Sequence, residues 1–215
     1  MALPRGRFIA FEGGEGAGKS TQTRMLVDAL EARGVPTETT REPGGTPGAE
    51  AIRDLLLAPP GAGWTREAEA LLFAAARADH VARRILPALE AGRWVVCDRF
   101  VDSSRAYQGG AGGLGDQAIL ALHAFGSAGL RPDLSVLLDV GEGLVTRRLA
   151  VRDGEASDAI GGRSEEYHRA VANTFRSLAE ADPQGFVVID GEGDPAAVHD
   201  RVLEALAPLL VPVTR

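Results

Sequence analysis

The sequence predicts an α/β fold with a doubly wound, five-stranded parallel sheet and helices on both faces. Short apolar runs alternate with longer segments of helical periodicity, which is typical of consecutive βα units. Four runs have apolar residues at consecutive positions, and this pattern indicates strands buried on both faces of a parallel sheet. Three of these runs end in aspartate and the first ends in glutamate, so we expect ligands to bind among acidic side chains at the carboxyl edge. The four predicted strands are residues 7–12, Trp94–Asp98, Leu134–Asp139 and Phe186–Asp190.

The other elements follow from the polarity and periodicity of the stretches between these strands. The more polar stretch Thr37–Arg41 predicts a fifth strand nearer to an edge of the sheet. Gly34 closely follows the first helical stretch and is typical of a helix C-terminus. No linker divides the 215 residues, so we expect a single domain over residues 1–215. The predicted helices are residues 19–33, 48–57, 66–89, 116–125, 143–151, 165–182 and 195–206.

Composition and charge exclude several classes of protein. The net charge of −7 argues against a protein that coats nucleic acid, so we expect no nucleic-acid partner. No stretch approaches the roughly 18 apolar residues of a membrane-spanning helix, and no secretory signal precedes residue 12, so we expect a cytoplasmic protein without a membrane partner. The single cysteine, Cys97, excludes an internal disulfide and a zinc site of several thiolates, and its apolar neighbours indicate that it is buried.

Residues 13–20 match the nucleotide-binding pattern G-x-x-x-x-G-K-[ST] in full, between a predicted strand and a predicted helix. Its glycines let backbone N–H groups converge on phosphate oxygens, and the helix N-terminus adds its positive dipole end. Lys19 is expected to neutralise the β and γ phosphates, and the Ser20 hydroxyl to ligate Mg²⁺. A chance match is improbable because Lys19 is the only lysine beside 22 arginines. The expected loop residues are Gly13, Gly14, Glu15, Gly16, Ala17, Gly18, Lys19, Ser20 and Thr21.

The same lysine count narrows the class of nucleotide-binding protein. A guanine-reading N-K-x-D motif and the K-G-G-x-x-K loop of partitioning ATPases each need a further lysine, so small phosphate-loop kinases remain. Residues 110–115 formally match the dinucleotide pattern G-x-G-x-x-G. No apolar strand precedes them, so we expect a flexible connection there instead.

Further motifs follow the phosphate loop in a fixed order. R-E-P-G-G lies at 41–45, D-R-F at 98–100 and A-Y-Q-G-G at 106–110, and an aromatic residue and an arginine lie four apart at 73 and 77. In this combination the chain resembles the bacterial thymidylate kinases from about residue 8 to residue 189. Those enzymes phosphorylate dTMP to dTDP with ATP and Mg²⁺. The resemblance implies the phosphate-loop kinase fold with a mobile lid over about residues 152–163.

The resemblance also implies which residues bind the phosphate and sugar of dTMP. Arg99 would hold the dTMP phosphate, for which the guanidinium fork is well suited. Arg53 matches a second phosphate-binding arginine. Glu15 would contact the sugar 3′-hydroxyl, and Tyr107 would exclude a 2′-hydroxyl.

For the base, the resemblance implies a stack and a set of polar contacts. Phe73 would stack on thymine while Arg77, on the same helix face, bonds a base carbonyl. Without the other motifs these two would be interpreted as a core aromatic and a solvated arginine. The remaining expected contacts are Pro43 beside the thymine, Ser104 at its polar edge, and Gln108.

Catalysis in such an enzyme depends on holding two anionic phosphates in line and neutralising the charge between them. The acceptor phosphate is largely dianionic at pH 7, since its second pKa lies near 6, so no strong general base is needed. Accordingly, none of the four histidines lies in a motif, and we expect them in core or surface roles. Lys19, Arg99 and Mg²⁺ would supply positive charge, and Asp98 would hold the metal together with Ser20.

Thymidylate kinases place an extra catalytic basic residue in the phosphate loop or in the lid. This loop has no arginine, and where relatives often read D-R-I-E in the lid, residues 158–161 here read D-A-I-G. Arg152 and Arg163 are the possible substitutes, at different offsets. Arg148 resembles the arginine that stacks on adenine.

Assembly and two rival functions stay open at this point. The family is usually homodimeric through helices around residues 66–89, so a homodimer is expected, although the apolar surface of that helix could equally be core. Another nucleoside or nucleotide kinase of the same fold is the first rival. The second is a nucleotide-binding protein that has lost catalysis, for which Ala159 is the only hint.

Overall fold

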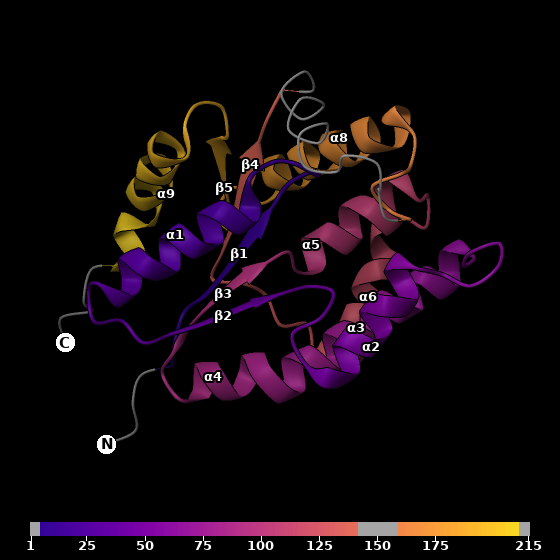
Figure 1. The fold of residues 1–215 in the computed structure, drawn as a ribbon, viewed down its shortest axis with the longest axis horizontal. Helices are drawn as coiled ribbons and strands as arrows, with labels where there is room; N and C mark the ends of the chain where they lie inside the picture. Colours follow the sequence, from indigo (N-terminus) through magenta and orange to yellow (C-terminus); the bar gives the residue numbers. More distant parts are fainter. Residues whose placement is uncertain (1–4, 142–158, 211–215) are drawn as a thin grey trace.

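The computed structural model describes residues 5–141 and 159–210, and a parallel sheet of five strands in the order β2-β3-β1-β4-β5 forms its centre (Figure 1). All five predicted strands are confirmed, and the first begins one residue later than expected. The polar strand lies at an edge of the sheet, as its composition predicted. The strands are β1 (Phe8–Glu12), β2 (Thr37–Arg41), β3 (Trp94–Asp98), β4 (Leu134–Asp139) and β5 (Phe186–Asp190).

Helices occupy the stretches between the strands, as predicted. The expected helix 66–89 is one helical stretch with a π-helical segment inside it, and the last helix continues to residue 210 instead of ending at 206. The expected helix at 143–151 lies outside the described residues. The described helices are α1 (Lys19–Glu31), α2 (Pro47–Leu57), α3 (Arg66–His80), η1 (Val81–Ile85), α4 (Leu86–Glu90), α5 (Val101–Ser104), η2 (Arg105–Ala111), α6 (Asp116–Ser127), α8 (Glu165–Ala181) and α9 (Pro195–Leu210).

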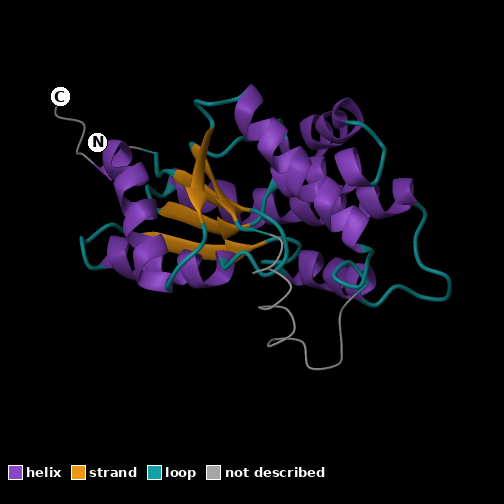
Figure 2. Cartoon of the chain, turned by 90° about the horizontal axis from the view of Figure 1, so that it is seen from above, coloured by secondary structure: helices purple, strands orange, loops and turns teal. Residues whose placement is uncertain are grey.

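Helices cover both faces of the sheet (Figure 2). Successive side chains of a strand point to opposite faces, so neighbouring residues of β1 pack against different helices. Ile9 and Phe11 of β1 are fully buried in the core cluster that includes residues of α1 and α9. Phe8 is fully buried in a second cluster, against η1 and α4. Cys97 belongs to this second cluster, so its predicted burial is confirmed.

The helices that carry predicted site residues begin at defined caps. The Thr46 hydroxyl accepts a bond from Ala49 N at the start of α2, and Pro47 occupies the first helical position. Thr65 and Ser164 cap α3 and α8 in the same way. These caps set where the helices begin and therefore which side chains face the carboxyl edge of the sheet.

The strand order reverses at β1, which lies between β3 and β4. In doubly wound sheets this switch point leaves a crevice beyond the carboxyl ends of the strands. Glu12 and Asp98 end β1 and β3 at this edge. Within the two described ranges, no helix combines the length and apolar character needed to cross a membrane.

A flexible connection was expected over the glycine-rich stretch 110–115, but Gly110 and Ala111 form the end of η2, and residues 112–115 connect η2 to α6. A Cβ at Gly110 would lie 2.2 Å from Thr174 Oγ1 of α8. The absence of a side chain at Gly110 therefore lets η2 and α8 pack closely together. This glycine serves helix packing, which neither the phosphate-loop pattern nor the dinucleotide pattern could indicate.

We predict that Gly110→Ala lowers the free energy of unfolding by about 1–3 kcal/mol, because the new methyl group overpacks this contact. Adding Thr174→Ala removes the hydroxyl and methyl groups that crowd it and should recover part of the loss. Denaturant unfolding of both single variants and the double variant measures this coupling. Strictly additive effects of the two substitutions would show that the clash does not cause the loss of stability.

Candidate active site

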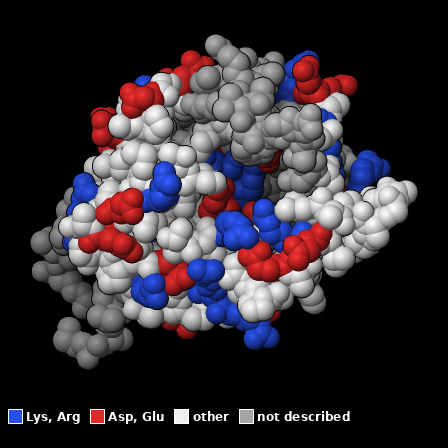
Figure 3. Space-filling model, viewed as in Figure 1, with Lys and Arg blue, Asp and Glu red and all other residues white. Residues whose placement is uncertain are grey.

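A cavity of about 560 Å³ opens at the carboxyl ends of β1 and β3, and the space-filling view shows charged side chains of both signs around this hollow (Figure 3). Most of the predicted site residues line it, although they come from well-separated parts of the chain. The predicted residues in its wall are Glu15, Gly16, Gly18, Lys19, Ser20, Thr21, Pro43, Arg53, Phe73, Arg77, Asp98, Arg99, Ser104, Tyr107 and Gln108.

The phosphate loop connects β1 to α1 through glycines in left-handed or otherwise unusual backbone conformations. Gly13, Gly16 and Gly18 have φ of 137°, 67° and 96°, which side chains disfavour. A Cβ at Gly13 would also lie 2.7 Å from the Leu138 carbonyl oxygen. Gly13, Gly14 and Ala17 shape the loop without lining the cavity.

Lys19 is 7% exposed, and its ammonium group crosses the inside of this loop. Its Nζ donates to the carbonyl oxygens of Gly13 at 3.1 Å and Gly14 at 2.7 Å. Burial, together with the nearby Arg99 charge, lowers the pKa of Lys19 to about 8. A bound phosphate would stabilise the charged form that burial disfavours.

Ser20 and Asp98 bring two oxygen groups together at the mouth of the loop. Ser20 Oγ donates to Asp98 Oδ2 at 2.6 Å. Across the described ranges, no group of three His, Cys, Asp or Glu side chains could hold a metal. Mg²⁺ commonly binds through one or two protein oxygens and completes its shell with phosphates and water, so this donor pair fits Mg²⁺.

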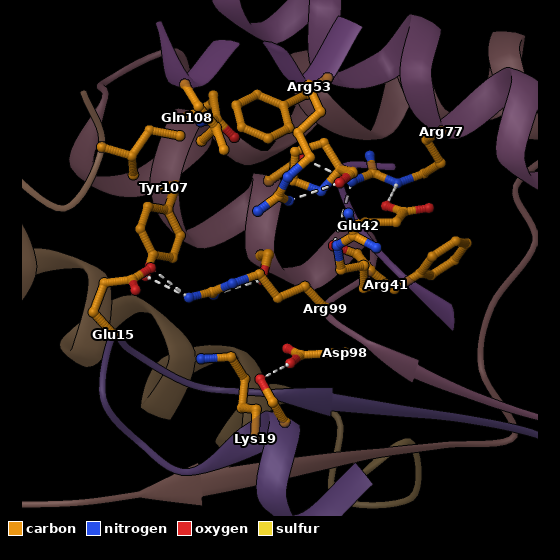
Figure 4. A pocket seen from close by; sticks show the side chains of 18 of the residues that line it. Glu15, Lys19, Arg41, Glu42, Arg53, Arg77, Asp98, Arg99, Tyr107 and Gln108 are labelled. Atoms are coloured by element: carbon orange, nitrogen blue, oxygen red, sulfur yellow. Dashed lines mark hydrogen bonds and ion pairs between the residues drawn. The ribbon is translucent and has the colours of Figure 1, made fainter. Parts of the chain in front are cut away.

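Arg99 reaches across the cavity from the end of β3 toward Glu15 and Tyr107 (Figure 4). Its Nη2 donates to Glu15 Oε1 at 2.7 Å and to the Tyr107 hydroxyl at 3.3 Å, and its Nη1 donates to the Gly13 carbonyl at 3.0 Å. Arg99 also has φ of 72°, a costly conformation for a residue with a long side chain. The strained backbone and the salt bridge together direct the guanidinium at the phosphate loop.

The opposite end of the cavity is organised around Arg77, which is 3% exposed. Its Nε donates to Glu42 Oε2 at 2.7 Å, and its Nη2 donates to Ser104 Oγ at 2.8 Å. His80 Nδ1 lies 3.0 Å from Glu42 Oε1, and its Nε2 lies 2.7 Å from Thr40 Oγ1. Burial raises the pKa of Glu42, but Arg77 and His80 outweigh it and leave this pKa below its usual value.

Phe73 and Pro43 complete this end of the cavity, and Arg53 of α2 lines the wall beside Pro43. Arg53 Nη1 donates to the Pro43 carbonyl at 2.8 Å, so α2 and the turn after β2 are joined beside the cavity. Figure 4 shows Arg53 and Gln108 at the side away from Lys19 and Asp98. The cavity therefore extends from a phosphate-binding end to an end with an aromatic ring and buried polar groups.

Sequence reasoning missed three buried polar residues that support the site: Glu12, Glu42 and His80. All three had a detectable signal, and Glu42 is part of the R-E-P-G-G motif at 41–45. Glu12 ends the first strand at the carboxyl edge, and His80 lies three residues after Arg77, on the same helix face. The other cavity residues, to which the sequence analysis assigned no role, are Arg41, Leu57, Phe100, Ser103 and Ile160.

The lid residues divide into two groups. Arg148 and Arg152 lie outside the described residues. Arg163 is described, but it does not line the cavity and instead contacts Glu69 and Tyr167. At position 159, where relatives often have arginine, Ala159 N donates to the Leu57 carbonyl at 3.3 Å.

A phosphate loop at the switch point of a doubly wound sheet, facing an arginine across a deep cavity, defines a phosphate-loop nucleotide kinase. The comparisons with known proteins identify the family. A family model described as thymidylate kinase matches residues 11–202, and the chain belongs to this family, whose members use ATP as phosphate donor.

The similarity to these relatives extends over nearly the whole chain. A thymidylate kinase of Rhizorhabdus wittichii is 57% identical over 95% of this chain and 99% of its own length. One from Rhodopseudomonas palustris (strain CGA009) is 49% identical over 94% of this chain and 89% of its own. The crystal structure of thymidylate kinase from Ehrlichia chaffeensis superposes with a TM-score of 0.77 at 31% identity, covering 94% of this chain and 100% of that one.

We predict a pH effect from Glu12, which is fully buried and accepts bonds from the backbone N–H of Phe100 at 2.8 Å and the Ser103 hydroxyl at 2.6 Å. Burial, reinforced by Asp102, raises its pKa to about 8. The folded state therefore keeps a proton that the unfolded chain loses near pH 4.5. The stabilisation is complete below that pH and is lost as pH rises toward 8.

Glu12→Gln mimics the protonated acid and should flatten this dependence. The difference in slope between the wild type and the variant should be at most about 1.4 kcal/mol per pH unit between pH 5 and 8. Denaturant unfolding at several pH values measures both slopes. Parallel curves for the two proteins would contradict the prediction.

Proposed function

We propose that this enzyme transfers the γ-phosphate of ATP to the phosphate of dTMP and so produces dTDP and ADP. The observation that carries the proposal is the position of Arg99, whose guanidinium lies between the phosphate loop and the Arg77 end of the cavity. A phosphate held there is placed next to the γ-phosphate of a nucleotide in the loop. The family of the chain supports the same reaction.

Different residues of the acceptor site would contact the phosphate and the sugar of dTMP. Arg99 and Arg53 bind its phosphate, and Glu15 accepts a bond from the 3′-hydroxyl. Tyr107 fills the space that a 2′-hydroxyl would need. Each of these side chains lines the same cavity.

The thymine base would occupy the end of the cavity that contains Phe73 and Pro43. Arg77 is fixed there by Glu42 through Nε and by Ser104 through Nη2, and its Nη1 makes no hydrogen bond with the described residues. That nitrogen can donate to a base carbonyl, and Ser104 lies beside it. A pyrimidine with a carbonyl at this edge satisfies the buried donor, whereas an amino group would repel it.

Charge neutralisation in the transferring complex would come from Lys19, Arg99 and a magnesium ion. Ser20 and Asp98 are the residues that would hold Mg²⁺, which when bound shields the phosphate oxygens of ATP. Lys19 places an ammonium group against the phosphates at the N-terminus of α1. The dTMP phosphate needs no base to remove a proton, so alignment and charge supply the rate enhancement.

A further cation is expected on the ATP side. We propose Arg152 for this catalytic role and Arg148 for stacking on adenine. Arg163 stays the alternative to Arg152, but its contacts with Glu69 and Tyr167 point its guanidinium to another partner. Because Arg163 is already engaged with Glu69 and Tyr167, we favour Arg152 for the catalytic role.

We also propose a homodimer that works in the cytoplasm, where ATP is available as the phosphate donor. Leu71 of α3 and Phe125 of α6 are 56% and 95% exposed. These two helices pack side by side (Figure 1). An apolar surface shared by α3 and α6 is suited to pairing with a second copy.

The substrate proposal predicts that dTMP has the highest kcat/KM among nucleoside monophosphates. dUMP should follow, and nucleotides with an amino group at the corresponding base position should be poorer by about 10²-fold or more, because they leave buried donors unpaired. A coupled assay of ADP formation with a panel of acceptors measures this order. A different best acceptor would overturn the assignment, and binding of ATP and dTMP without turnover would indicate a non-catalytic protein.

The catalytic proposal predicts that Arg152→Ala lowers kcat by about 10²–10³-fold, because a charge that acts mainly in the transition state is lost. The Kd for dTMP, measured by calorimetry, should stay within about twofold of the wild-type value. Steady-state kinetics of this variant provide the test. Wild-type turnover would mean that the positive charge comes from elsewhere.

A further inference from the structure

Five side-chain and backbone groups form a closed ring of hydrogen bonds on the outer side of the acceptor cavity. Gln108 Nε2 donates to Glu69 Oε1 at 2.9 Å, and the other oxygen of Glu69 accepts from Arg163 Nη2. Arg163 Nη1 donates to the Tyr167 hydroxyl at 2.5 Å, and that hydroxyl donates to the Tyr107 carbonyl at 2.8 Å. Because Tyr107 and Gln108 are neighbours in the chain, the ring closes through their backbone.

The ring joins three parts of the fold. Glu69 lies on α3, Tyr107 and Gln108 lie on η2, and Tyr167 lies in the first turn of α8. Arg163, just before α8, is the member that connects the α3 arm to the α8 arm. Its guanidinium also stacks over the Tyr167 ring, with 4.6 Å between Arg163 Cζ and the ring centroid.

Two members of the ring face the cavity, and the others hold them from behind. Tyr107 and Gln108 are 4% and 3% exposed and line the cavity, whereas Arg163 does not. The Glu69 carboxylate can only accept, so it fixes the Gln108 amide with its NH₂ group turned to α3. The amide oxygen of Gln108 is then the acceptor that this side chain presents to another donor.

We propose that Arg163 is a positioning residue of the acceptor site, which orients Tyr107 and Gln108 through Tyr167 and Glu69. The inference rests on the proposed function, because it assigns Tyr107 to the sugar of dTMP. Without Arg163, the Glu69 carboxylate loses its cation and the Tyr167 hydroxyl loses a donor. Both arms of the ring then have alternative conformations, and the wall of the sugar site loosens.

The test compares Arg163→Met and Arg163→Lys with the wild type, and Arg169→Met, which changes an exposed arginine of α8, is the matched control. Acceptors are dTMP and ribothymidine 5′-monophosphate, which differ only in the 2′-hydroxyl. For Arg163→Met we expect the KM for dTMP to rise about 5–20-fold while kcat stays within about threefold. The preference for the deoxy acceptor should fall about tenfold, and the KM for ATP should not change. Arg163→Lys should restore part of the loss, and Arg169→Met should behave as wild type.

A double-mutant cycle locates the effect in the ring. Glu69→Gln should raise the KM for dTMP similarly, and combining it with Arg163→Met should add little, because both break the same link. Thermal unfolding of each variant shows whether it is folded. If Arg163→Met is not folded, Arg163→Lys still allows the comparison with the wild type.

A fall in kcat of about 100-fold with an unchanged KM for dTMP would make Arg163 a catalytic cation and overturn the proposal. Wild-type values of KM and of deoxy preference would also overturn it. Failure of the proposed function is separate from these outcomes, since it would appear in the wild type as a different preferred acceptor.

Discussion

The salt bridge between Arg99 and Glu15 connects the phosphate loop with the acceptor side of the cavity, and the site depends on it. One guanidinium contacts the Gly13 carbonyl, the Glu15 carboxylate and the Tyr107 hydroxyl, so it joins the phosphate loop, the end of β3 and η2. The bridge is partly buried, with the two side chains 15% and 21% exposed, where a charge pair is screened less than at the surface. Its contacts also offset part of the cost of the unfavourable φ of Arg99.

Buried acidic side chains at the end of β1 and in the turn after β2 set the rest of the geometry of the site. Glu12 Oε1 accepts hydrogen bonds from the backbone N–H groups of Phe100 and Ser103, at 2.8 Å and 3.3 Å, and so fixes the start of α5. Glu42 fixes Arg77 and is itself paired with His80. Glu12 keeps its proton below about pH 8, whereas Glu42 is paired with Arg77. Each acid has hydrogen-bond donors inside the fold, because an unsatisfied buried polar group is costly. Hydrogen bonds within the protein therefore hold side chains at both ends of the cavity.

The sequence predicted most of this fold because its strongest signals are local. Consecutive apolar residues marked four of the five strands, and glycine-rich spacing with Lys19 marked the phosphate loop. The network around Glu42 and His80 was not predicted, because it joins residues 38 positions apart that pair only after β2 and α3 have packed. The role of Gly110 was missed for the same reason, since its close contact is Thr174 on α8. Pairwise contacts across the fold leave no periodic trace in the chain.

Before substrate binds, Arg99 and Glu15 are each other's partners, and this fact bears on selectivity. In the proposed function, the acceptor phosphate takes the guanidinium and the 3′-hydroxyl takes the carboxylate. A ligand with the phosphate alone would separate the pair and leave Glu15 without its closest cation, while one with the hydroxyl alone would face a carboxylate already neutralised by Arg99. A molecule that carries both groups at the spacing of a 5′-nucleotide exchanges both contacts at once, because its phosphate pairs with Arg99 and its hydroxyl donates a hydrogen bond to Glu15. The cost of opening the bridge thus becomes a means of discrimination.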